Sequence, residues 1–226
     1  MKSAVLLKKT PGLVAAFAVV VCLLLPGFVR AQTLSLKELA SRVDHHYNAL
    51  HSLQINFTQH YQGMGMDRRE SGVLLLKKSG RMRWTYFNPA GKLFILDGHN
   101  AWFYSPGQTT AQRVPAKELS DLRSPLSLLL GHTKLEKELH GLIMEPAANG
   151  LYMLTGVPKG MENRVASLTL TVTPDGVIHS MEVDETDGVR NTFHFSNARP
   201  NAPAPDSAFV FTPPAGVQVV EGMPPV

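Results

Sequence analysis

The chain has a single cysteine among its 226 residues, and it lies near the start. Cys22 is inside an apolar run, Leu13–Leu25, that follows a basic start and is too short to span a bilayer. Val29–Ala31 then places small residues at the third and first positions before a cleavage point. This pattern predicts a cleaved secretory signal peptide over residues 1–31 and an exported mature chain over 32–226, without disulfides or thiol chemistry.

An alternative interpretation is that Cys22 itself is lipidated. Val21 precedes it, where a small residue is expected, and Leu23–Leu25 would then begin the mature chain. We therefore favour cleavage after Ala31. The remaining chain is long enough to bury a stable core without covalent cross-links.

An excess of positive charge is also lacking once the first 31 residues are set aside. Four of the 22 Lys and Arg residues and none of the 18 Asp and Glu residues precede residue 32, so 18 of each sign remain. A formally neutral chain has no general attraction for a phosphate backbone. We expect no nucleic-acid partner.

The sequence has no recognisable constellation of catalytic or metal-binding residues. Its nine histidines are scattered, and the adjacent His45 and His46 fall on different faces of a predicted helix. It has no nucleophile elbow, no glycine-rich phosphate loop and no carboxylate pair framed by apolar residues. We predict no metal, no cofactor and no catalytic residue. An enzyme whose groups are brought together only by folding stays an alternative.

What the sequence does contain begins with an amphipathic helix. Ser35–Glu38 forms a capping box, in which the serine hydroxyl and the glutamate carboxylate would satisfy each other's backbone donors. Apolar side chains follow at spacings of three and four residues, at Leu36, Leu39, Val43, Tyr47 and Leu50. One face of this helix must therefore be covered.

Most of the remaining chain alternates with a period of two, which is typical of strands. Turn residues such as Ser79-Gly80 and Asp187-Gly188 separate these segments. The predicted strands lie near 53–61, 71–78, 82–87, 92–97, 101–105, 112–114, 141–146, 150–156, 165–173, 177–184 and 189–196.

A second, short helix is predicted at Ser124–Gly131, with a serine cap, a proline in the first turn and a terminal glycine. Leucines occupy most of its circumference, so it needs an apolar support. About eleven strands and two helices predict a mainly β fold, an incomplete antiparallel β-barrel covered by a short α-helical lid. No repeat or linker divides residues 32–226, so we predict one domain.

One predicted strand is apolar on both faces. In Val73–Leu76 every side chain is aliphatic, whereas residues 81–86 alternate. A sheet with one solvent-exposed face normally has polar side chains on that face. The second apolar face must therefore be covered by the core, by a partner or by an apolar ligand. Trp84, Trp102 and several methionines add adaptable apolar surface, although each of them would also suit an ordinary core.

Several segments, in order along nearly the whole of residues 32–226, resemble those of the outer-membrane lipoprotein carrier family of the LolA type. They are Phe57-Thr58-Gln59, Gly72 through Trp84-Thr85-Tyr86 with Asn88-Pro89, Asp97-Gly98, Ala101–Pro106, Ser124–Leu130 and Phe209–Val217. The resemblance implies a soluble periplasmic carrier that holds the acyl chains of lipoproteins in an apolar cavity. It further implies an inner-membrane ABC-type release complex as donor and an outer-membrane lipoprotein acceptor, with no covalent step. We expect a monomer.

The resemblance also implies where the acyl chains bind. The predicted cavity and lid residues are Leu39, Val43, Leu74, Leu76, Met82, Trp84, Leu128 and Leu129. In the family a basic residue after the Gly72 strand holds the lid shut, and Lys78 occupies that position. Lysine lacks the planar five-donor fork of arginine, so the lid is expected to be looser here. A Lys78 that only solubilises a turn is the alternative.

Three other functions fit parts of the pattern. They are a lid-covered β-module in an envelope-sensing or regulatory protein, a lipocalin-like periplasmic binder of small free lipids, and an unrecognised hydrolase. The absence of a usable lipidation cysteine separates the carrier from a lipid-anchored acceptor of similar shape.

Overall fold

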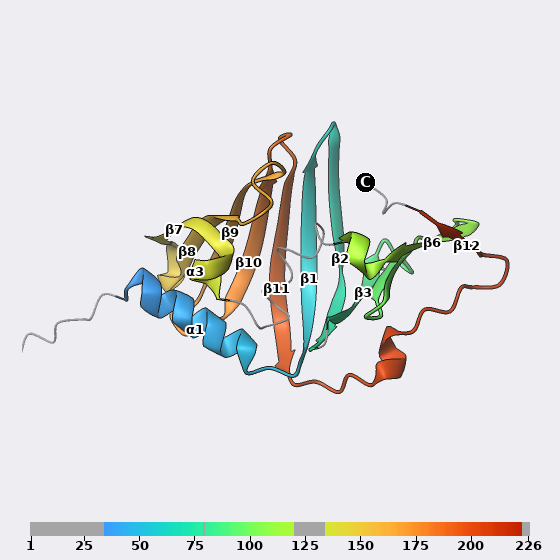
Figure 1. The fold of residues 1–226 in the computed structure, drawn as a ribbon, viewed down its shortest axis with the longest axis horizontal. Coiled ribbons are helices and arrows are strands. Elements are labelled where there is room, and N and C mark those ends of the chain that lie inside the picture. The colour runs from blue at the N-terminus through green and yellow to red at the C-terminus, as the bar shows by residue number, and fades with distance from the viewer. Residues whose placement is uncertain (1–33, 79, 120–133, 223–226) are drawn as a thin grey trace, which may run out of the picture. The chain divides into compact units, whose positions relative to one another are not determined.

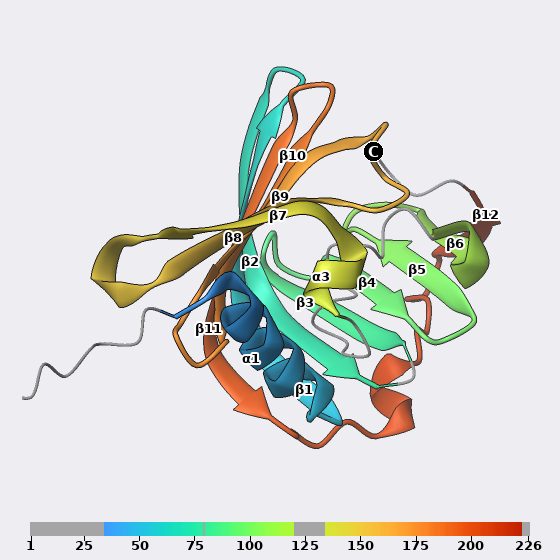
Figure 2. The ribbon, with the colours of Figure 1, turned by 60° about the vertical axis from the view of Figure 1, so that its left-hand side comes forward.

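The chain folds around one large sheet with a helix packed on one of its faces (Figures 1 and 2). The computed structural model describes residues 34–78, 80–119 and 134–222, which fall in the compact unit Leu34–Val226. The predictions for the signal peptide, Cys22 and the helix at Ser124–Gly131 concern residues outside these ranges.

Five helical segments and twelve strands make up the described fold. The helical segments are α1 (Leu36–Asn48), η1 (Ala116–Leu119), α3 (Leu135–Glu138), η2 (Ala148–Gly150) and η3 (Asp206–Phe209). The strands are β1 (Ser52–Gly63), β2 (Met66–Lys77), β3 (Arg81–Asn88), β4 (Leu93–Leu96), β5 (Asn100–Tyr104), β6 (Thr110–Pro115), β7 (Leu139–Pro146), β8 (Tyr152–Pro158), β9 (Val165–Val172), β10 (Ile178–Glu185), β11 (Arg190–Pro200) and β12 (Gln218–Glu221).

The sheet consists of two meanders joined at β1 and β11. Its strand order is β12-β6-β5-β4-β3-β2-β1-β11-β10-β9-β8-β7, and every neighbouring pair is antiparallel except β12 with β6. The edge strands β7 and β12 are not paired with each other, so the sheet stays open. The predicted incomplete antiparallel barrel is confirmed, with twelve described strands where about eleven were expected.

Helix α1 forms where the apolar spacing predicted it. The Ser35 hydroxyl accepts a hydrogen bond from the Glu38 N–H at 3.2 Å, which confirms the N-cap. The capping box also predicts a bond from the Ser35 N–H to the Glu38 carboxylate. The Glu38 carboxylate instead forms an ion pair with Arg42 at 2.6 Å. The apolar stripe with Leu39 and Val43 is buried in the main core. Figure 2 shows α1 lying across one face of the sheet with α3 beside it.

On the opposite, outer face of the sheet, the chain's own C-terminal segment, residues 201–217, contacts β2, β3 and β5. The Arg83 guanidinium donates to the Ala208 carbonyl at 3.0 Å, and the Phe211 ring lies 5.3 Å from the ring of Trp102. Phe209, at the end of η3, is 1 % exposed. Leu75 lies directly opposite Arg83 and so shares this outer face, which accounts for an apolar side chain on the second side of its strand.

Candidate functional site

Six of the eight predicted acyl-binding residues come together on the inner face, which we define as the face that carries Ile55 and Phe57 of β1. These six residues belong to one core cluster and are at most 3 % exposed: Leu39, Val43, Leu74, Leu76, Met82 and Trp84. Their role in binding stays a prediction. The other two, Leu128 and Leu129, lie outside the described residues.

Strand pairing explains why the sheet residues of this cluster share a face. Leu74 lies opposite Trp84, and Leu76 opposite Met82, and directly opposed residues point to the same side of a sheet. Phe57 pairs with Gly72, where a Cβ would lie 2.1 Å from the Thr85 carbonyl oxygen and 3.0 Å from the Phe57 ring. Glycine at position 72 therefore leaves room for the Thr85 carbonyl group and the Phe57 ring.

Aromatic rings fill the middle of the inner face. The Phe57 ring contacts the Trp84 ring edge-on, with centroids 4.5 Å apart, and the Trp84 ring lies 5.6 Å from that of Phe193. The Trp84 indole N–H donates to the Met82 sulfur at 3.2 Å, which is a weak acceptor. This surface offers contact area and polarisability and almost no hydrogen bonding, which suits hydrocarbon.

Helix α1 is held over this surface by a few polar contacts at its sides and end. The Tyr47 hydroxyl accepts from the Ile178 N–H at 3.0 Å, and the Asp44 carboxylate accepts from the Leu135 N–H at 3.0 Å. Burial raises the pKa of Asp44 and outweighs the lowering effect of that hydrogen bond. These contacts fix the helix against β10 and α3.

Lys78 contacts α1. Its ammonium donates to the carbonyl of Asn48, the last residue of the helix, and its N–H donates to the His51 carbonyl at 2.9 Å. A cation at the C-terminal end of a helix also meets the negative end of the helix dipole. The predicted partner, the helix at Ser124–Gly131, lies outside the described residues. The contact that the structure shows is a tether on α1.

The inner face becomes polar toward the tips of β1 and β2. The Lys92 ammonium binds the Glu70 carboxylate at 2.6 Å and lies 4.4 Å from the centre of the Tyr86 ring. Burial is the main cause that raises the pKa of Tyr86, and the negative charge of Glu70 raises it further. The Gln59 side-chain N–H donates to the Asn191 side-chain oxygen at 3.1 Å. Gln59 is a residue to which the sequence pattern assigned no role.

The Asp97-Gly98 motif and Trp102 have a structural role in the turn between β4 and β5. The Asp97 carboxylate accepts from the His99 and Asn100 N–H groups, both at 2.7 Å, and from the Trp102 indole at 2.8 Å. Burial alone would raise the pKa of Asp97, but these donors outweigh it and lower the pKa. This motif shapes the turn and does not touch the inner cluster.

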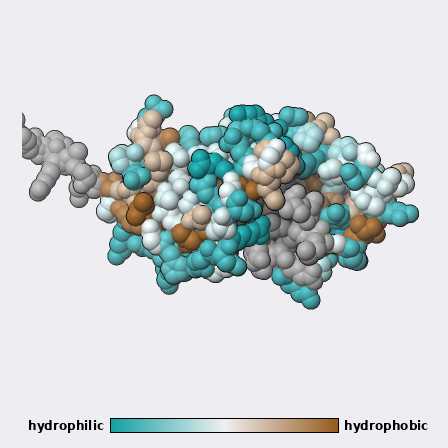
Figure 3. Space-filling view, turned by 90° about the horizontal axis from the view of Figure 1, so that it is seen from above, coloured by the Kyte–Doolittle hydropathy of each residue, from teal (hydrophilic) through white to brown (hydrophobic). Residues whose placement is uncertain are grey.

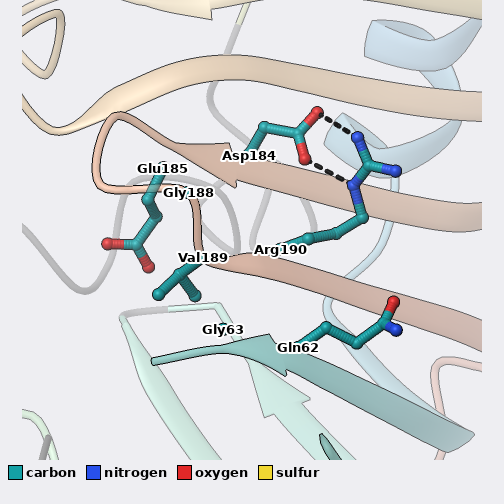
Figure 4. A pocket seen from close by; sticks show the side chains of 7 residues that line it. All are labelled: Gln62, Gly63, Asp184, Glu185, Gly188, Val189 and Arg190. Carbon is teal, nitrogen blue, oxygen red and sulfur yellow. Dashed lines mark hydrogen bonds and ion pairs between the residues drawn. The ribbon is translucent and has the colours of Figure 1, made fainter. Parts of the chain in front are cut away.

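Two pockets lie away from the six clustered residues. One of about 470 Å³ is lined by Gln62, Gly63, Asp184, Glu185, Gly188, Val189 and Arg190 (Figure 4). Arg190 pairs there with Asp184 at 2.6 Å. The other, of about 390 Å³, is lined by Thr58, Gln59, His60, Arg69, Glu70, Ser71, Asn88, Thr192 and His194. Neither contains a predicted acyl-binding residue, and the six described ones are buried in the core cluster instead.

The surface and the described helices add two further facts. Hydrophobic surface occurs in separate patches on the mostly hydrophilic face seen in Figure 3. In the part of the chain that the structure describes, no helix is long and apolar enough to cross a membrane, and no group of three or more His, Cys, Asp or Glu side chains is placed to hold a metal ion.

Comparison with known proteins identifies sequences that are similar to this chain. The sequence profile of the family described as "Outer membrane lipoprotein carrier protein LolA" matches residues 48–212. An outer-membrane lipoprotein carrier protein of Nitrosospira multiformis is 32% identical over 152 residues, covering 66% of this chain and 72% of the relative. One of Methylococcus capsulatus is 30% identical over 210 residues, covering 91% and 97%. The crystal structure of an uncharacterized conserved protein from Thermus thermophilus has a TM-score of 0.52 at 13% identity, covering 82% and 98%, and shows the fold alone.

Proposed function

Because the chain belongs to the family of LolA-type outer membrane lipoprotein carrier proteins, we propose that it binds the acyl chains of lipoproteins on the inner face and carries them across the periplasm. The observation that supports this most is that six predicted residues from α1, β2 and β3 belong to one buried apolar cluster between the helix and the sheet. The donor is an inner-membrane ABC-type release complex, and the acceptor is an outer-membrane lipoprotein acceptor.

The physical need for such a carrier follows from the cost of exposing acyl chains to water. Each methylene contributes about 0.8 kcal/mol of transfer free energy, so a triacylated anchor does not diffuse freely between membranes. A carrier must also release its cargo. A flexible, partly filled apolar site binds less tightly than a fully complementary one, and so a more apolar acceptor can take the anchor over.

Entry of the acyl chains requires α1 to move. The sheet residues of the cluster are packed together with Leu39 and Val43 of α1. Among the described residues, the side-chain contacts that attach α1 to the rest of the fold include Arg42 to Pro174, Asp44 to Leu135, Tyr47 to Ile178 and Lys78 to Asn48. Acyl chains that take the place of Leu39 and Val43 replace one apolar contact with another. The exchange therefore exposes little apolar surface.

The remaining parts of the proposal concern export and chemistry. Residues 1–31 act as a cleaved signal peptide, and residues 32–226 form one carrier domain that works as a monomer. The protein needs no catalytic residue, because binding and release of a preformed anchor make and break no covalent bond.

Purified residues 32–226 test this function directly. Incubated with inner-membrane vesicles, energised release complex and no detergent, the protein should elute together with released lipoprotein in size-exclusion chromatography. Mass spectrometry then identifies the bound species. Recovery of only fatty acid or phospholipid would indicate a small-lipid binder, and recovery of no bound species would favour the envelope-sensing module.

A further inference from the structure

Two glutamines leave a buried side-chain oxygen without a hydrogen-bond partner. These oxygens are Gln59 Oε1 and Gln112 Oε1. Among residues 34–78, 80–119 and 134–222, no other buried side-chain nitrogen or oxygen lacks a hydrogen-bond partner. Buried polar atoms are nearly always paired, because leaving one unpaired costs free energy. An orphan acceptor on a ligand-binding face is therefore a candidate contact for the ligand.

Both oxygens belong to residues on the inner face. Gln59 lies two residues from Phe57 and directly opposite Phe193 of β11. Gln112 lies directly opposite Phe103, which packs against the main core. Four strands, β2 to β5, separate their strands in the sheet. The two oxygens therefore lie on distant parts of the inner face, and only Gln59 lies beside the Phe57 and Phe193 rings.

The neighbours of Gln59 leave its carbonyl oxygen as the available acceptor. Its N–H donates to the Asn191 side-chain oxygen at 3.1 Å, which orients the amide. Glu70, opposite Gln59 on β2, is occupied by Lys92 through bonds of 2.6 and 2.8 Å to its two oxygens. Gln59 thus presents an unused acceptor where the aromatic surface around Phe57 and Phe193 meets a polar border.

We propose that Gln59 Oε1 accepts a hydrogen bond from the amide N–H that joins the N-linked acyl chain to the lipoprotein and so distinguishes this anchor from ester lipids. The inference rests on the proposed carrier function. In an N-acylated lipoprotein one chain is joined through an amide and the peptide continues from the same residue, so N–H donors lie at the junction of hydrocarbon and polar head. Free fatty acids and diacylglycerols have no N–H there.

Such a hydrogen bond makes binding selective, because a ligand that cannot form it leaves a buried acceptor unpaired, which costs free energy. A site with a buried group that hydrogen-bonds its ligand rejects an analogue that lacks the partner, since the buried group then stays unpaired. A hydrophobic surface alone does not separate the acyl chains of a lipoprotein from those of the membrane lipids around it. Gln59 supplies that distinction with one atom.

The experiment compares two synthetic lipopeptides. One is a cysteinyl peptide with an S-diacylglyceryl group and an N-palmitoyl amide, and the other carries a methyl group on that amide nitrogen. Affinities are measured by displacement of anilinonaphthalene sulfonate from residues 32–226. The wild type should prefer the N–H form by about tenfold, the effect of one unpaired buried acceptor. In Gln59→Met the ratio of the two affinities should fall to about one.

Two control variants isolate the position. Gln54→Met changes a glutamine on the other face of β1, and Gln112→Met removes the second orphan acceptor on the inner face. Both should keep the wild-type preference. Near-ultraviolet circular dichroism of each empty variant checks that the fold is intact, and Gln59→Leu serves if Gln59→Met fails this check.

The outcomes separate this inference from the function on which it rests. If neither lipopeptide displaces the dye from the wild type, the carrier function is wrong. If both bind the wild type equally well, the carrier function stands and the role of Gln59 is overturned. The role is also overturned if Gln59→Met keeps the preference, or if Gln112→Met loses it to the same extent.

Discussion

Tyr47 is the residue of α1 whose polar contact is most deeply buried. It is 3 % exposed, its hydroxyl accepts from the Ile178 N–H, and burial raises the pKa of Tyr47 to about 12. Tyr47→Phe would leave the Ile178 N–H unpaired and should lower the free energy of unfolding by about 1–3 kcal/mol in urea titrations. Tyr152→Phe is the control, because the Tyr152 hydroxyl has no partner in the described part of the chain. Equal losses in both variants would contradict this role.

Asp206 provides the pH dependence that the structure predicts most clearly. Hydrogen bonds from Lys77 and Arg81 lower its pKa from 3.8 to about 2. A carboxylate whose pKa is lower in the folded state stabilises the fold above its ordinary pKa and loses that contribution as the pH falls toward the folded value. The Asp206→Asn variant should therefore unfold at a lower temperature than the wild type at neutral pH.

The stabilisation by Asp206 is lost once its carboxylate is protonated in the folded protein. The difference in melting temperature between Asp206→Asn and the wild type should shrink as the pH is lowered from 3.8 to about 2. High salt at neutral pH should also reduce it, because the group is exposed. A difference that stayed constant across this pH range would show that Asp206 acts through something other than its charge.

At the scale of elements, the turn between β9 and β10 sets how closely α1 approaches the sheet. Gly176 has a φ of +87°, and a Cβ there would lie 2.5 Å from backbone atoms of Arg42 and Val43. Gly176→Ala should push α1 outward, lower stability and increase the binding of an apolar dye. Gly188→Ala is a matched control, since its φ is +88° and nothing lies within 4 Å of its added Cβ.

Both alanines carry the backbone cost of a positive φ, which is about 1–2 kcal/mol. The contact with α1 is the difference between them. We therefore expect the Gly176→Ala variant to lose more free energy of unfolding than Gly188→Ala, and only Gly176→Ala to increase dye fluorescence. Equal effects would mean that the turn does not position the helix.

The tether between β2 and α1 gives a second prediction at this scale. Lys78 holds the carbonyl end of α1, while its neighbour Lys77 pairs with Asp206 on the outer face. Lys78→Met should increase the access of an apolar dye to the inner face, whereas Lys77→Met should not. Lys78→Arg should decrease it, because a guanidinium can hold more than one carbonyl. Unchanged access in both Lys78 variants would contradict the tether.

The elements could be predicted from the sequence to the extent that their signals are local. Alternation between turn residues placed β3, β5 and β9 within one or two residues, and the serine cap placed α1. The start of β2 at Met66 was missed, because Met66–Arg69 does not alternate and is paired only through its register with β1. Strand β12 was missed for a similar reason: it pairs in parallel with β6, more than a hundred residues earlier in the chain.

The candidate site shows the same division between local and distant information. Alternation placed Leu74 and Leu76 on one face of their strand, because that depends on neighbouring residues alone, whereas it was the family resemblance that grouped them with Met82 and Trp84; the register of β2 with β3 puts all four on one face. It did not reveal that residues 201–217 cover the other face of β2. Nor did it distinguish Gln59 from a solvated glutamine, because burial of that side chain depends on three strands at once.

At the scale of the whole molecule, the two faces of the sheet have separate covers. The main core cluster contains α1 and the inner face, whereas the buried residues Ile95 and Phe209 of the outer face are not part of it. Residues 201–217 are tied to the outer face by Asp206 and Ala208. In the proposed function, this separation would let α1 move while residues 201–217 stay bound to β2, β3 and β5.

Phe209→Ala tests whether the two covers are independent. Truncating this ring should lower the free energy of unfolding by about 3–5 kcal/mol, because it leaves a cavity on the outer face. The affinity of the folded fraction for an N-acylated lipopeptide should not change, since Phe209 does not touch the inner cluster. Val43→Ala, which opens a gap under α1, should change both quantities. If Phe209→Ala altered lipopeptide affinity as strongly as Val43→Ala does, the two faces would be coupled, and α1 could not open without loosening the C-terminal segment.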